Sequence, residues 1–530
     1  MRIGIDVGGT NTDAVLLDGT RVRAWRKKPT TADVSSGIIN VIRDLLGGST
    51  VRPSDIDSVM IGTTQFTNAV VERRKLLPVG VIRVALPATA GLRPFVAWPD
   101  DLRKAVEGEV HLVRGGYQYD GSINSALDED AIAEAARSIR QQGIPAVAVS
   151  GLFSPVNSDM EERALDIIRN EHPDASITLS HRIGRLGILE RENAAIINAS
   201  LSRLAAEVVS SFRHALRTLE INAPFFISQN DGTLMAADVV EQFPVLTFAS
   251  GPTNSMRGAA FLSGISDGLV IDIGGTTSDI GVLVHGFPRE SSLNVDIGGV
   301  RTNFRMPDIL AIGLGGGSLV RQKNALSIGP QSVGYEILEK AIVFGGDTLT
   351  ATDIAVAAGY ADVGDRERAA HLSPHFVEAA VTRMHAIIEE GIDRMKTSPD
   401  PVPVILVGGG SILISRHLDG ASEVIVPDHA SVANAVGAAI AQVGGEVDRV
   451  YSYTQMGREA ALAEARDHAI KAAMEAGARH DTIRIFDIEE VPLPYVPGGA
   501  VRVRVKAAGS LDLGLSTTSA SSSAGQARAD

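Results

Sequence analysis

Cysteine is absent from the 530 residues of this chain, so disulfides, thiolate metal sites and cysteine nucleophiles are excluded. Aromatic residues make up only 4% of the sequence. Apolar runs stay well below the ~18 residues that would cross a bilayer, and the N-terminus lacks the basic and apolar regions of a signal peptide. We therefore expect no membrane partner and a cytoplasmic location.

Positive charge is also scarce, because 49 Lys and Arg face 63 Asp and Glu and leave a net charge of −14. Nucleic acids and anionic membranes attract basic surfaces, so this balance disfavours both as partners. Hydrophobic residues at 44% and charged residues at 21% are ordinary for a soluble globular protein. The length exceeds what a single core usually supports, and roughly two to four domains are expected.

One phrase occurs twice in the sequence, as DVGGTNTD at 6–13 and as DIGGTTSD at 272–279. Both copies begin and end with aspartate and share the central Gly-Gly-Thr. Strand-like residues flank both copies, at 3–7 and 14–17 around the first and at 269–273 and 280–284 around the second. We therefore predict that each phrase is a tight loop between two antiparallel strands.

The composition of these loops fits the binding of a phosphate group. Two glycines without Cβ atoms let backbone N–H groups converge on an anion, and the threonine hydroxyl adds a hydrogen bond. The leading aspartate would repel a phosphate but can hold Mg²⁺, directly or through water. The predicted phosphate-binding residues are Gly8, Gly9, Thr10, Gly274, Gly275 and Thr276, and the predicted magnesium ligands are Asp6 and Asp272. For the closing Asp13 and Asp279, a cap on the loop backbone and a role in the site are both left open.

Strand-like and helix-like segments alternate over the rest of the chain. Helices are predicted over 159–170, 190–219, 433–443 and 457–477, and strands over 146–149, 225–228, 245–248 and 404–407. Alternating patterns predict two further strands within 483–494 and 500–509. The Ser- and Ala-rich end at 515–530 is expected to be a disordered tail.

The paired loops resemble those of the superfamily of actin, Hsp70 and sugar or acetate kinases, whose two related domains face ATP across a cleft. VGGGS at 407–411 is similar to the adenosine loop of that superfamily, and implies that Gly408, Gly409, Gly410 and Ser411 face the nucleotide. ANAVGAAIA at 433–441 resembles its second interdomain helix, and the helix expected near 191–219 is then the first. The implied fold class is α/β, a two-domain actin-like (ribonuclease H-like) ATPase fold with a small α+β extension at the C-terminus.

A narrower resemblance is to the A-type subunit of the hydantoinase/oxoprolinase family, in its short branch. The motifs that carry it are IGTTQFTNAVVER at 61–73, TLSHRIGRLGILERENAAIINA at 178–199, FASGPTNSMRGAA at 248–260, and IGLGGGSLV followed by IGPQSVGYE. The similarity covers roughly residues 1–445. We divide the chain into a first actin-like domain at 1–195, a second at 196–445, a C-terminal helix and strands at 446–514, and the tail.

The resemblance implies ATP-dependent opening of a cyclic amide such as a hydantoin, 5-oxoproline or a lactam, with ATP and Mg²⁺ as cofactors. Asp6, Asp272, Thr10 and Thr276 would then be catalytic, with a B-type partner subunit or a homo-oligomer as the assembly. Two alternatives stay open. One is a small-molecule kinase of the same fold, and the other is a reactivating factor or chaperone that uses ATP to drive domain motion.

The residues that would recognise the substrate are less clear from the sequence. Candidates are Thr63, Thr64, Asn68 and His181, although Thr67 and Asn68 also fit a helix start and His181 also fits a structural histidine. Glu190 and Arg191 are expected to be structural. GLGGGS at 313–318 reads as a second anion loop or a lid, and Asp347 and Asp353 as caps or ligands. The sequence lacks the HExxH zinc motif and the GxSxG serine-nucleophile motif.

Overall fold

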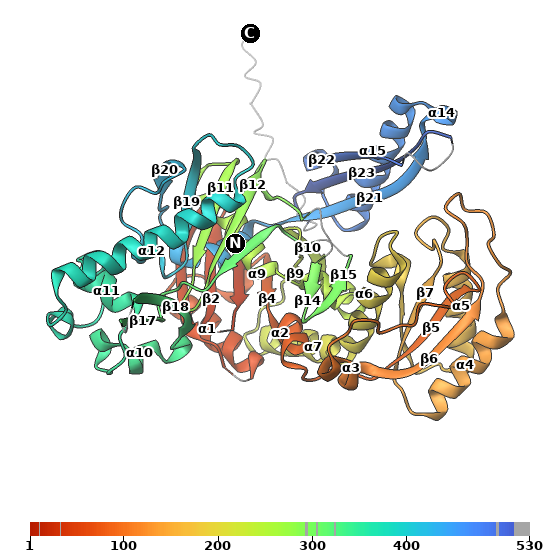
Figure 1. The fold of residues 1–530 in the computed structure, drawn as a ribbon, viewed down its shortest axis with the longest axis horizontal. Helices are drawn as coiled ribbons and strands as arrows, with labels where there is room; N and C mark the ends of the chain where they lie inside the picture. Colours follow the sequence, from red (N-terminus) through yellow and green to blue (C-terminus); the bar gives the residue numbers. More distant parts are fainter. Residues whose placement is uncertain are drawn as a thin grey trace, which may run out of the picture.

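The computed structural model describes residues 1–9, 11–31, 33–291, 295–303, 306–322, 325–493 and 498–512 (Figure 1). Thr10, predicted to lie in the first phosphate loop, and the expected tail at 515–530 fall outside these described residues. The described chain is organised around a nine-stranded, a six-stranded and a four-stranded sheet, with helices between the strands. The predicted α/β class is therefore confirmed.

The first sheet carries the first aspartate–glycine loop. Its strand order is β22-β23-β21-β10-β9-β4-β1-β2-β3. These strands are β1 (Arg2–Val7), β2 (Asn11–Asp18), β3 (Arg21–Pro29), β4 (Ser58–Thr63), β9 (Phe225–Ser228), β10 (Thr233–Ala236), β21 (Gln442–Ser452), β22 (Arg484–Pro492) and β23 (Ala500–Gly509). β1 pairs antiparallel with β2 and parallel with β4, so the loop after β1 is a hairpin turn, as predicted.

The second sheet carries the second loop in the same way. Its strands are β13 (Phe287–Pro288), β12 (Ser278–Val284), β11 (Gly268–Ile273), β19 (Val402–Val407) and β20 (Ala421–Ile425), in that order, with β16 (Ile309–Ile312) also paired to β12. β11 is antiparallel to β12 and parallel to β19. The 22-residue helix α12 (Pro374–Met395) packs on this sheet and begins at the capping hydroxyl of Ser373.

The two loops occupy equivalent positions in the two sheets. Asp6 pairs with Asp13 in the register of β1 and β2, and Asp272 pairs with Asp279 in the register of β11 and β12. In each sheet the strand that ends at the loop also has a parallel neighbour on its other side. This duplication is the two-domain actin-like architecture that the sequence resembles.

A third sheet lies at the far end from the second sheet (Figure 1). Its strands are all parallel, in the order β6 (Glu107–Arg114), β5 (Val79–Leu86), β7 (Ala146–Gly151) and β8 (Ser176–Leu179). The helices α4 (Glu129–Gln141) and α5 (Asp159–Glu171) pack with it around a hydrophobic core of its own. β5 and β7 are buried almost throughout, as expected for parallel strands that are covered on both faces.

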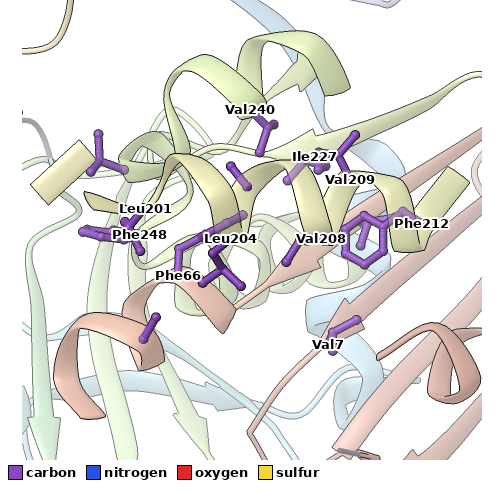
Figure 2. Close-up of a cluster of buried hydrophobic side chains, with 14 of the residues drawn as sticks. Val7, Phe66, Leu201, Leu204, Val208, Val209, Phe212, Ile227, Val240 and Phe248 are labelled. Atoms are coloured by element: carbon purple, nitrogen blue, oxygen red, sulfur yellow. The ribbon is translucent and has the colours of Figure 1, made fainter. Parts of the chain in front are cut away.

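The largest core lies between the first sheet and the helix α7 (Ser202–Thr218). Leu204, Val208 and Phe212 recur every four residues along one face of α7 and point into the same apolar cluster as Phe66 and Ile227 (Figure 2). Each such side chain contributes about 1.5–3 kcal/mol when it is fully removed from water. The helix α1 (Val34–Gly47) completes this layer against α7, β2 and β3.

Three predicted elements differ from the structure. The single helix expected over 190–219 is two helices, α6 (Ile188–Ser200) and α7, which meet at Leu201, because α6 is buried on nearly every side while α7 needs one solvent face. The strand expected over 245–248 is a 3₁₀ turn at Pro244–Thr247, since Pro244 cannot donate to a sheet ladder but suits a first helical turn. The helix expected over 433–443 ends at Ile440 because β21 begins at Gln442.

Two crossed helices, α9 (Ser250–Ser263) and α13 (Ala433–Ile440), connect the two large sheets. The expectation that residues 191–219 form the first connector is wrong, because α6 and α7 lead from β8 of the third sheet into β9 of the first sheet, whereas α9 leads from the first sheet to β11. A Cβ atom on Gly258 would overlap the Ala433 carbonyl, and one on Gly437 would overlap the Asn254 carbonyl. Glycine at these two positions lets the two backbones touch.

Residues from both ends of the chain build the first sheet. β9 pairs with β4, and β10 pairs with β9, although the sequence division assigns both strands to the second domain. The predicted boundary at 195 falls inside α6. All strands of the second sheet lie within 268–425. β21 to β23, with α15 (Arg458–Glu475) packed on them, continue the first sheet as the C-terminal extension (Figure 1). Among the described residues, no helix combines the length and apolar character that a membrane span requires.

Candidate active site

A cavity of about 380 Å³ lies where the two repeated loops approach each other. Its walls include Asp6, Gly8, Asn11 and Asp13 from the first loop, residues 272 and 274–277 from the second, and Gly408, Gly409 and Gly410. The start of α13 adds Ala433 and Asn434. The two copies of the phrase, far apart in sequence, thus face a single space.

Asp6 and Asp13 are held together on the first side of this cavity. The Nδ2 atom of Asn434 donates to Oδ2 of Asp6 and to Oδ2 of Asp13, at 2.9 Å in both cases. Nζ of Lys27, the cross-strand neighbour of Asp13, donates to Oδ2 of Asp13 at 3.0 Å. Oδ1 of Asp6 and Oδ1 of Asp13 are buried and accept no hydrogen bond of normal geometry from the described residues. Both carboxylates therefore keep acceptor capacity toward a ligand.

Asp272 lies opposite, on the second sheet. The hydroxyl of Ser255, from the connecting helix α9, is hydrogen-bonded to its carboxylate. A Cβ atom on Gly408 would overlap Oδ1 of Asp272, and a Cβ atom on Gly62 would overlap Oδ1 of Asp6. In both sheets, a glycine in or just after the neighbouring parallel strand leaves room for the leading carboxylate.

The four aspartates of the two loops have abnormal protonation equilibria. Burial, together with the charges of Asp13 and Asp272, raises the pKa of Asp6 to about 7, although the amides of Asn434 and Asn254 partly offset this. Burial and the charge of Asp272 likewise raise the pKa of Asp279 to about 7. Burial also raises the pKa of Asp272 and of Asp13, the latter despite Lys27. Such a cluster favours a bound cation.

The two glycines of each loop have different surroundings. The N–H groups of Gly8 and Gly274 close the turns by donating to the carbonyls of Asn11 and Thr277, at 3.0 and 2.9 Å. By contrast, a Cβ atom on Gly9 or Gly275 would meet no protein atom within 4 Å. The second glycine of each pair therefore borders open space, which a ligand can enter closely. Thr276 is exposed and also lines the cavity.

The GLGGGS segment at 313–318 supports the second loop. The N–H groups of Gly316 and Gly317 donate to the carbonyls of Gly274 and Gly275, at 3.0 and 2.7 Å. These two amides are engaged, so the segment is a scaffold for the loop rather than a second anion cradle. Asp353 caps α11 (Ala351–Ala357) through Thr350, which decides between the cap and ligand readings left open by the sequence. Asp347 contacts only the neighbouring Thr348 hydroxyl among the described residues.

The predicted substrate residues do not line this cavity. Thr63 and Thr64 lie at the end of β4, where the hydroxyl of Thr64 is 3.4 Å from the Val7 carbonyl, and Asn68 is exposed on α2 (Gln65–Glu72). Ser411 follows the glycines in a 3₁₀ turn and does not line the cavity. His181 lines a different cavity beside the third sheet. Arg191, expected to be structural, is buried and donates to the Gly151 carbonyl at 2.5 Å, while Glu190 is 3.6 Å from Arg301.

Among the cavity residues that were not predicted from the sequence, Asn434, Lys27 and Ser255 are the ones that hydrogen-bond the aspartates. Asn434 is the second residue of the small-residue motif ANAVGAAIA, and Ser255 lies within FASGPTNSMRGAA, so both residues belong to motifs that the sequence had already singled out. Asn434 contacts residues more than 400 positions earlier in the chain, and Ser255 and Asp272 lie on different elements, so a local pattern reports neither pair. Lys27 could have been found from its cross-strand place opposite Asp13.

The duplicated fold and the two facing aspartate–glycine loops are those of the actin-like architecture. Two models of one family match the chain, the "Hydantoinase/oxoprolinase N-terminal region" over residues 2–172 and "Hydantoinase/oxoprolinase" over residues 191–369. The chain therefore belongs to the hydantoinase/oxoprolinase family.

Among characterised relatives, the acetophenone carboxylase gamma subunit of Aromatoleum aromaticum is 29% identical over 68% of this chain and 53% of its own length. The caprolactamase subunit alpha of Pseudomonas jessenii is 28% identical over 68% of this chain and 54% of its own length. The chain thus spans about half the length of these curated relatives. The crystal structure of the ATP-dependent caprolactamase from Pseudomonas jessenii matches with a TM-score of 0.75 at 21% identity, covering 96% of this chain and 87% of that chain, which shows the shared fold.

Proposed function

We propose that this protein uses ATP and Mg²⁺ to open a cyclic amide, by phosphorylating the amide oxygen so that water can attack the ring carbon. The observation that carries the proposal is the pair of aspartate–glycine loops from two sheets around one cavity. The relation to a caprolactamase subunit supports an amide ring as the acceptor. Because both curated relatives are named as subunits, we infer that the chain works with a partner subunit.

Phosphorylation of the oxygen overcomes the low reactivity of an amide carbon toward water. The amide oxygen attacks the γ-phosphorus of ATP, the bond to the bridging oxygen breaks, and ADP leaves. Water then adds to the carbon of the resulting imidate-like phosphate, and the ring C–N bond breaks so that the amine leaves and an acyl phosphate remains. A second water hydrolyses the acyl phosphate to a carboxylate and inorganic phosphate. Catalysis of this kind depends on positioning and on neutralising charge more than on an unusual nucleophile.

The donor set of the cavity fits Mg²⁺. Mg²⁺ prefers a few carboxylates and keeps several waters, and it would be held by Asp6 and Asp272 directly or through water. The uncommitted Oδ1 of Asp6 and the raised pKa values of the aspartates support this assignment, since a cation relieves both. Among the described residues, no three His, Asp or Glu side chains converge as a dedicated metal cage. When bound, the ion would neutralise charge on the phosphates.

Other residues of the chain would bind the nucleotide and hold the aspartates. Gly275 and Thr276 border the open space suited to a phosphate, with Gly9 in the equivalent place of the first loop, and residues 408–410 are assigned to the adenosine side. Asn434 fixes the carboxylates of Asp6 and Asp13 relative to each other. Thr10 keeps its proposed role from the loop pattern alone.

A second candidate is the same phosphoryl activation applied to a ketone enolate during carboxylation, which the acetophenone carboxylase subunit favours. One assay separates the candidates. ATP hydrolysis is measured with hydantoin, 5-oxoproline and ε-caprolactam, and with acetophenone plus bicarbonate, before and after addition of a co-purified partner. Stimulation by a cyclic amide supports ring opening, and stimulation by the ketone alone supports carboxylation. Phosphorylated sugar as the product would instead support a kinase.

Variants of the loop aspartates complete the test. Asp6→Asn and Asp272→Asn should each lose at least about a hundredfold in ATP turnover while remaining folded, because each removes a charge that positions the reaction. Asp18→Asn, an exposed aspartate paired with Arg23, is the matched control and should keep full turnover. Full activity in both loop variants would rule out the proposed site.

A further inference from the structure

The C-terminal extension contacts the second sheet, although it continues the first. β21 pairs with β10 of the first sheet, and β23 and β22 follow outward in the strand order. The chain of the second sheet meets the extension along residues 287–290, which form β13 and the two residues after it. The two large sheets are thus joined here in addition to their connectors α9 and α13.

Phe287 is held between an arginine and a second phenylalanine. Its ring is stacked on Phe486 of β22, with ring centroids 4.0 Å apart and planes at 8° to each other. The guanidinium of Arg257, from α9, lies 3.8 Å from the centroid of the Phe287 ring and donates to the Gly286 carbonyl at 2.6 Å. A stacked ring this close occupies one face of Phe287, so the guanidinium covers the other face. Since Arg257 precedes Gly258, this stack lies beside the crossing of the connectors.

Glu290 receives basic side chains from outside the second sheet. Arg504 of β23 donates to its Oε2 at 2.9 Å, and Lys506 of β23 donates to its Oε1. Nη2 of Arg185, from the segment after β8, is 3.9 Å from the same carboxylate. The side chains of Glu290, Arg504 and Lys506 are 13%, 11% and 4% exposed, so salt screens their ion pairs little. Glu290 therefore binds the chain of the second sheet to the extension.

Arg504 and Lys506 have further carboxylates on the side of the first sheet. These carboxylates, which come from the β9–β10 turn, β21 and β22, are Asp231, Glu446, Asp487 and Glu489. Loss of the charge of Glu290 would thus leave both bases with an acidic partner. Glu290 links the two sheets, whereas the rest of this network holds the extension together.

A hairpin limits how far the two sheets could separate. β14 (Val295–Ile297) and β15 (Val300–Thr302) lie between β13 and β16 in the sequence, yet Ile297 and Val300 belong to the core of the first sheet. Nδ2 of Asn193, on α6, donates to the Arg301 carbonyl at 2.9 Å. Release of residues 287–290 would therefore loosen the second sheet without detaching it.

We propose that the C-terminal extension is a clamp that holds the second sheet at one angle to the first, the angle at which the two aspartate–glycine loops face a single cavity. The clamp consists of Phe287 and Glu290, held by Phe486, Arg504 and Lys506. A rotation about the crossing of α9 and α13 would carry Phe287 and Glu290 with the second sheet, while the other three residues stay with the first. Such a rotation would separate the stacked rings and the ion pairs.

The clamp therefore arranges the nucleotide cavity before ATP binds. A site held in its binding arrangement saves the ordering cost that a loose site would incur on binding. The proposed function enters only through the identity of the nucleotide, because the clamp is independent of the group that accepts the phosphate.

Measurement of a distance between the two sheets tests the clamp. The chain has no cysteine, so two introduced cysteines can carry spin labels at chosen places. Arg43→Cys on α1 and Thr382→Cys on α12 are exposed positions on the helices that cover the first and the second sheet. Pulsed electron paramagnetic resonance of this labelled protein without nucleotide should give a narrow distribution of distances. Glu290→Gln and Phe486→Leu should each widen that distribution at least about twofold, because other angles become populated.

Glu490→Gln is the matched control for the labelled protein. It removes the ion pair between Glu490 and Arg458, which lies within the extension, and should leave the distribution of distances unchanged. Circular dichroism shows whether each variant is folded. Phe486→Leu keeps an apolar side chain at its position, so it tests the clamp even if Glu290→Gln does not fold.

Titration with Mg²⁺ and ATP supplies a second readout. A wider set of angles leaves fewer molecules ready to bind, so both clamp variants should bind ATP at least about threefold more weakly. A distribution that stays narrow in both folded variants overturns the clamp, and so does a wider distribution with unchanged affinity for ATP. Neither measurement uses a cyclic amide. If no amide stimulates ATP hydrolysis while the clamp variants behave as expected, the proposed function alone fails.

Discussion

Asp6→Asn should make the ligand-free protein more stable, although it removes an essential carboxylate. Asp6 is 4% exposed, and its charge is opposed by burial and by Asp13 and Asp272. An asparagine has the same shape and no charge. Its Oδ1 can accept the Asn434 hydrogen bond that Oδ2 of Asp6 now accepts, and its amide can face the Asn254 side chain nearby. The substitution therefore removes repulsion without leaving a new unpaired group.

The pKa of Asp6 sets the size and the sign of the effect. A rise from 3.8 in the unfolded chain to about 7 in the folded chain means that folding favours the protonated acid. The penalty is absent below the unfolded pKa, grows as the pH rises, and levels off above pH 7. At about 1.4 kcal/mol for each pH unit, it reaches at most about 4 kcal/mol. Asp6→Asn should thus raise the free energy of unfolding by up to about 4 kcal/mol at pH 8. At pH 5 this increase should be about 3 kcal/mol smaller.

Urea unfolding of both proteins at pH 5 and pH 8, without nucleotide or metal, measures this difference. Asp18→Asn serves as the control. Arg23 lowers the pKa of the exposed Asp18, so replacing this aspartate should not raise the free energy of unfolding at high pH. Addition of Mg²⁺ and ATP should stabilise the unmodified protein more than Asp6→Asn. The reasoning about buried charge is refuted if Asp6→Asn is no more stable at pH 8, or if its gain is the same at both pH values.

Further substitutions test the helix crossing and the loops. Gly437→Ala should destabilise the fold by about 3 kcal/mol or more in thermal unfolding, because its Cβ would overlap the Asn254 carbonyl. The control is Gly47→Ala, which should be neutral or slightly stabilising because its Cβ would meet no atom within 4 Å. Gly275→Ala should change the free energy of unfolding by no more than about 0.5 kcal/mol. It should raise the KM for ATP at least about tenfold, since its methyl would enter the space proposed for a phosphate. An unchanged KM would show that Gly275 does not border the bound nucleotide. Lys27→Met should weaken ATP binding in a titration without changing the fold, because it removes the cation that pairs with Asp13; tighter binding would show that Lys27 does not face the phosphates.

The two loops and their strands could be predicted from the sequence because their information is local. Each aspartate–glycine phrase lies between alternating apolar runs, and both hairpins formed with the expected partners. A single loop does not predict where a ligand binds. Two equivalent loops between equivalent strands imply that both face one shared cleft. The local rules failed where tertiary packing decided the outcome, as at Leu201, where a buried helix and an amphipathic helix meet.

The long-range polar contacts could not be read from the sequence. Asn434 reaches Asp6 across the whole fold, and no spacing rule links these positions. His181 was a candidate for the substrate, but only the fold shows that it lines a different cavity from the phosphate loops. Side-chain chemistry indicated which residues were able to act, and topology decided which of them share a space.

The connecting helices tie the geometry of the cavity to the relative position of the two sheets. α9 leads from the first sheet into the second, and its Ser255 is hydrogen-bonded to Asp272 of the second sheet. α13 leads back from the second sheet into the first, and its Asn434 bonds Asp6 and Asp13 of the first sheet. Each connector thus supports the leading aspartate of the sheet that it enters. Gly258 and Gly437 hold the two connectors in backbone contact, so a rotation about their crossing would displace both carboxylates together. Any change in the angle between the two sheets at this crossing would therefore move the groups proposed to hold the metal.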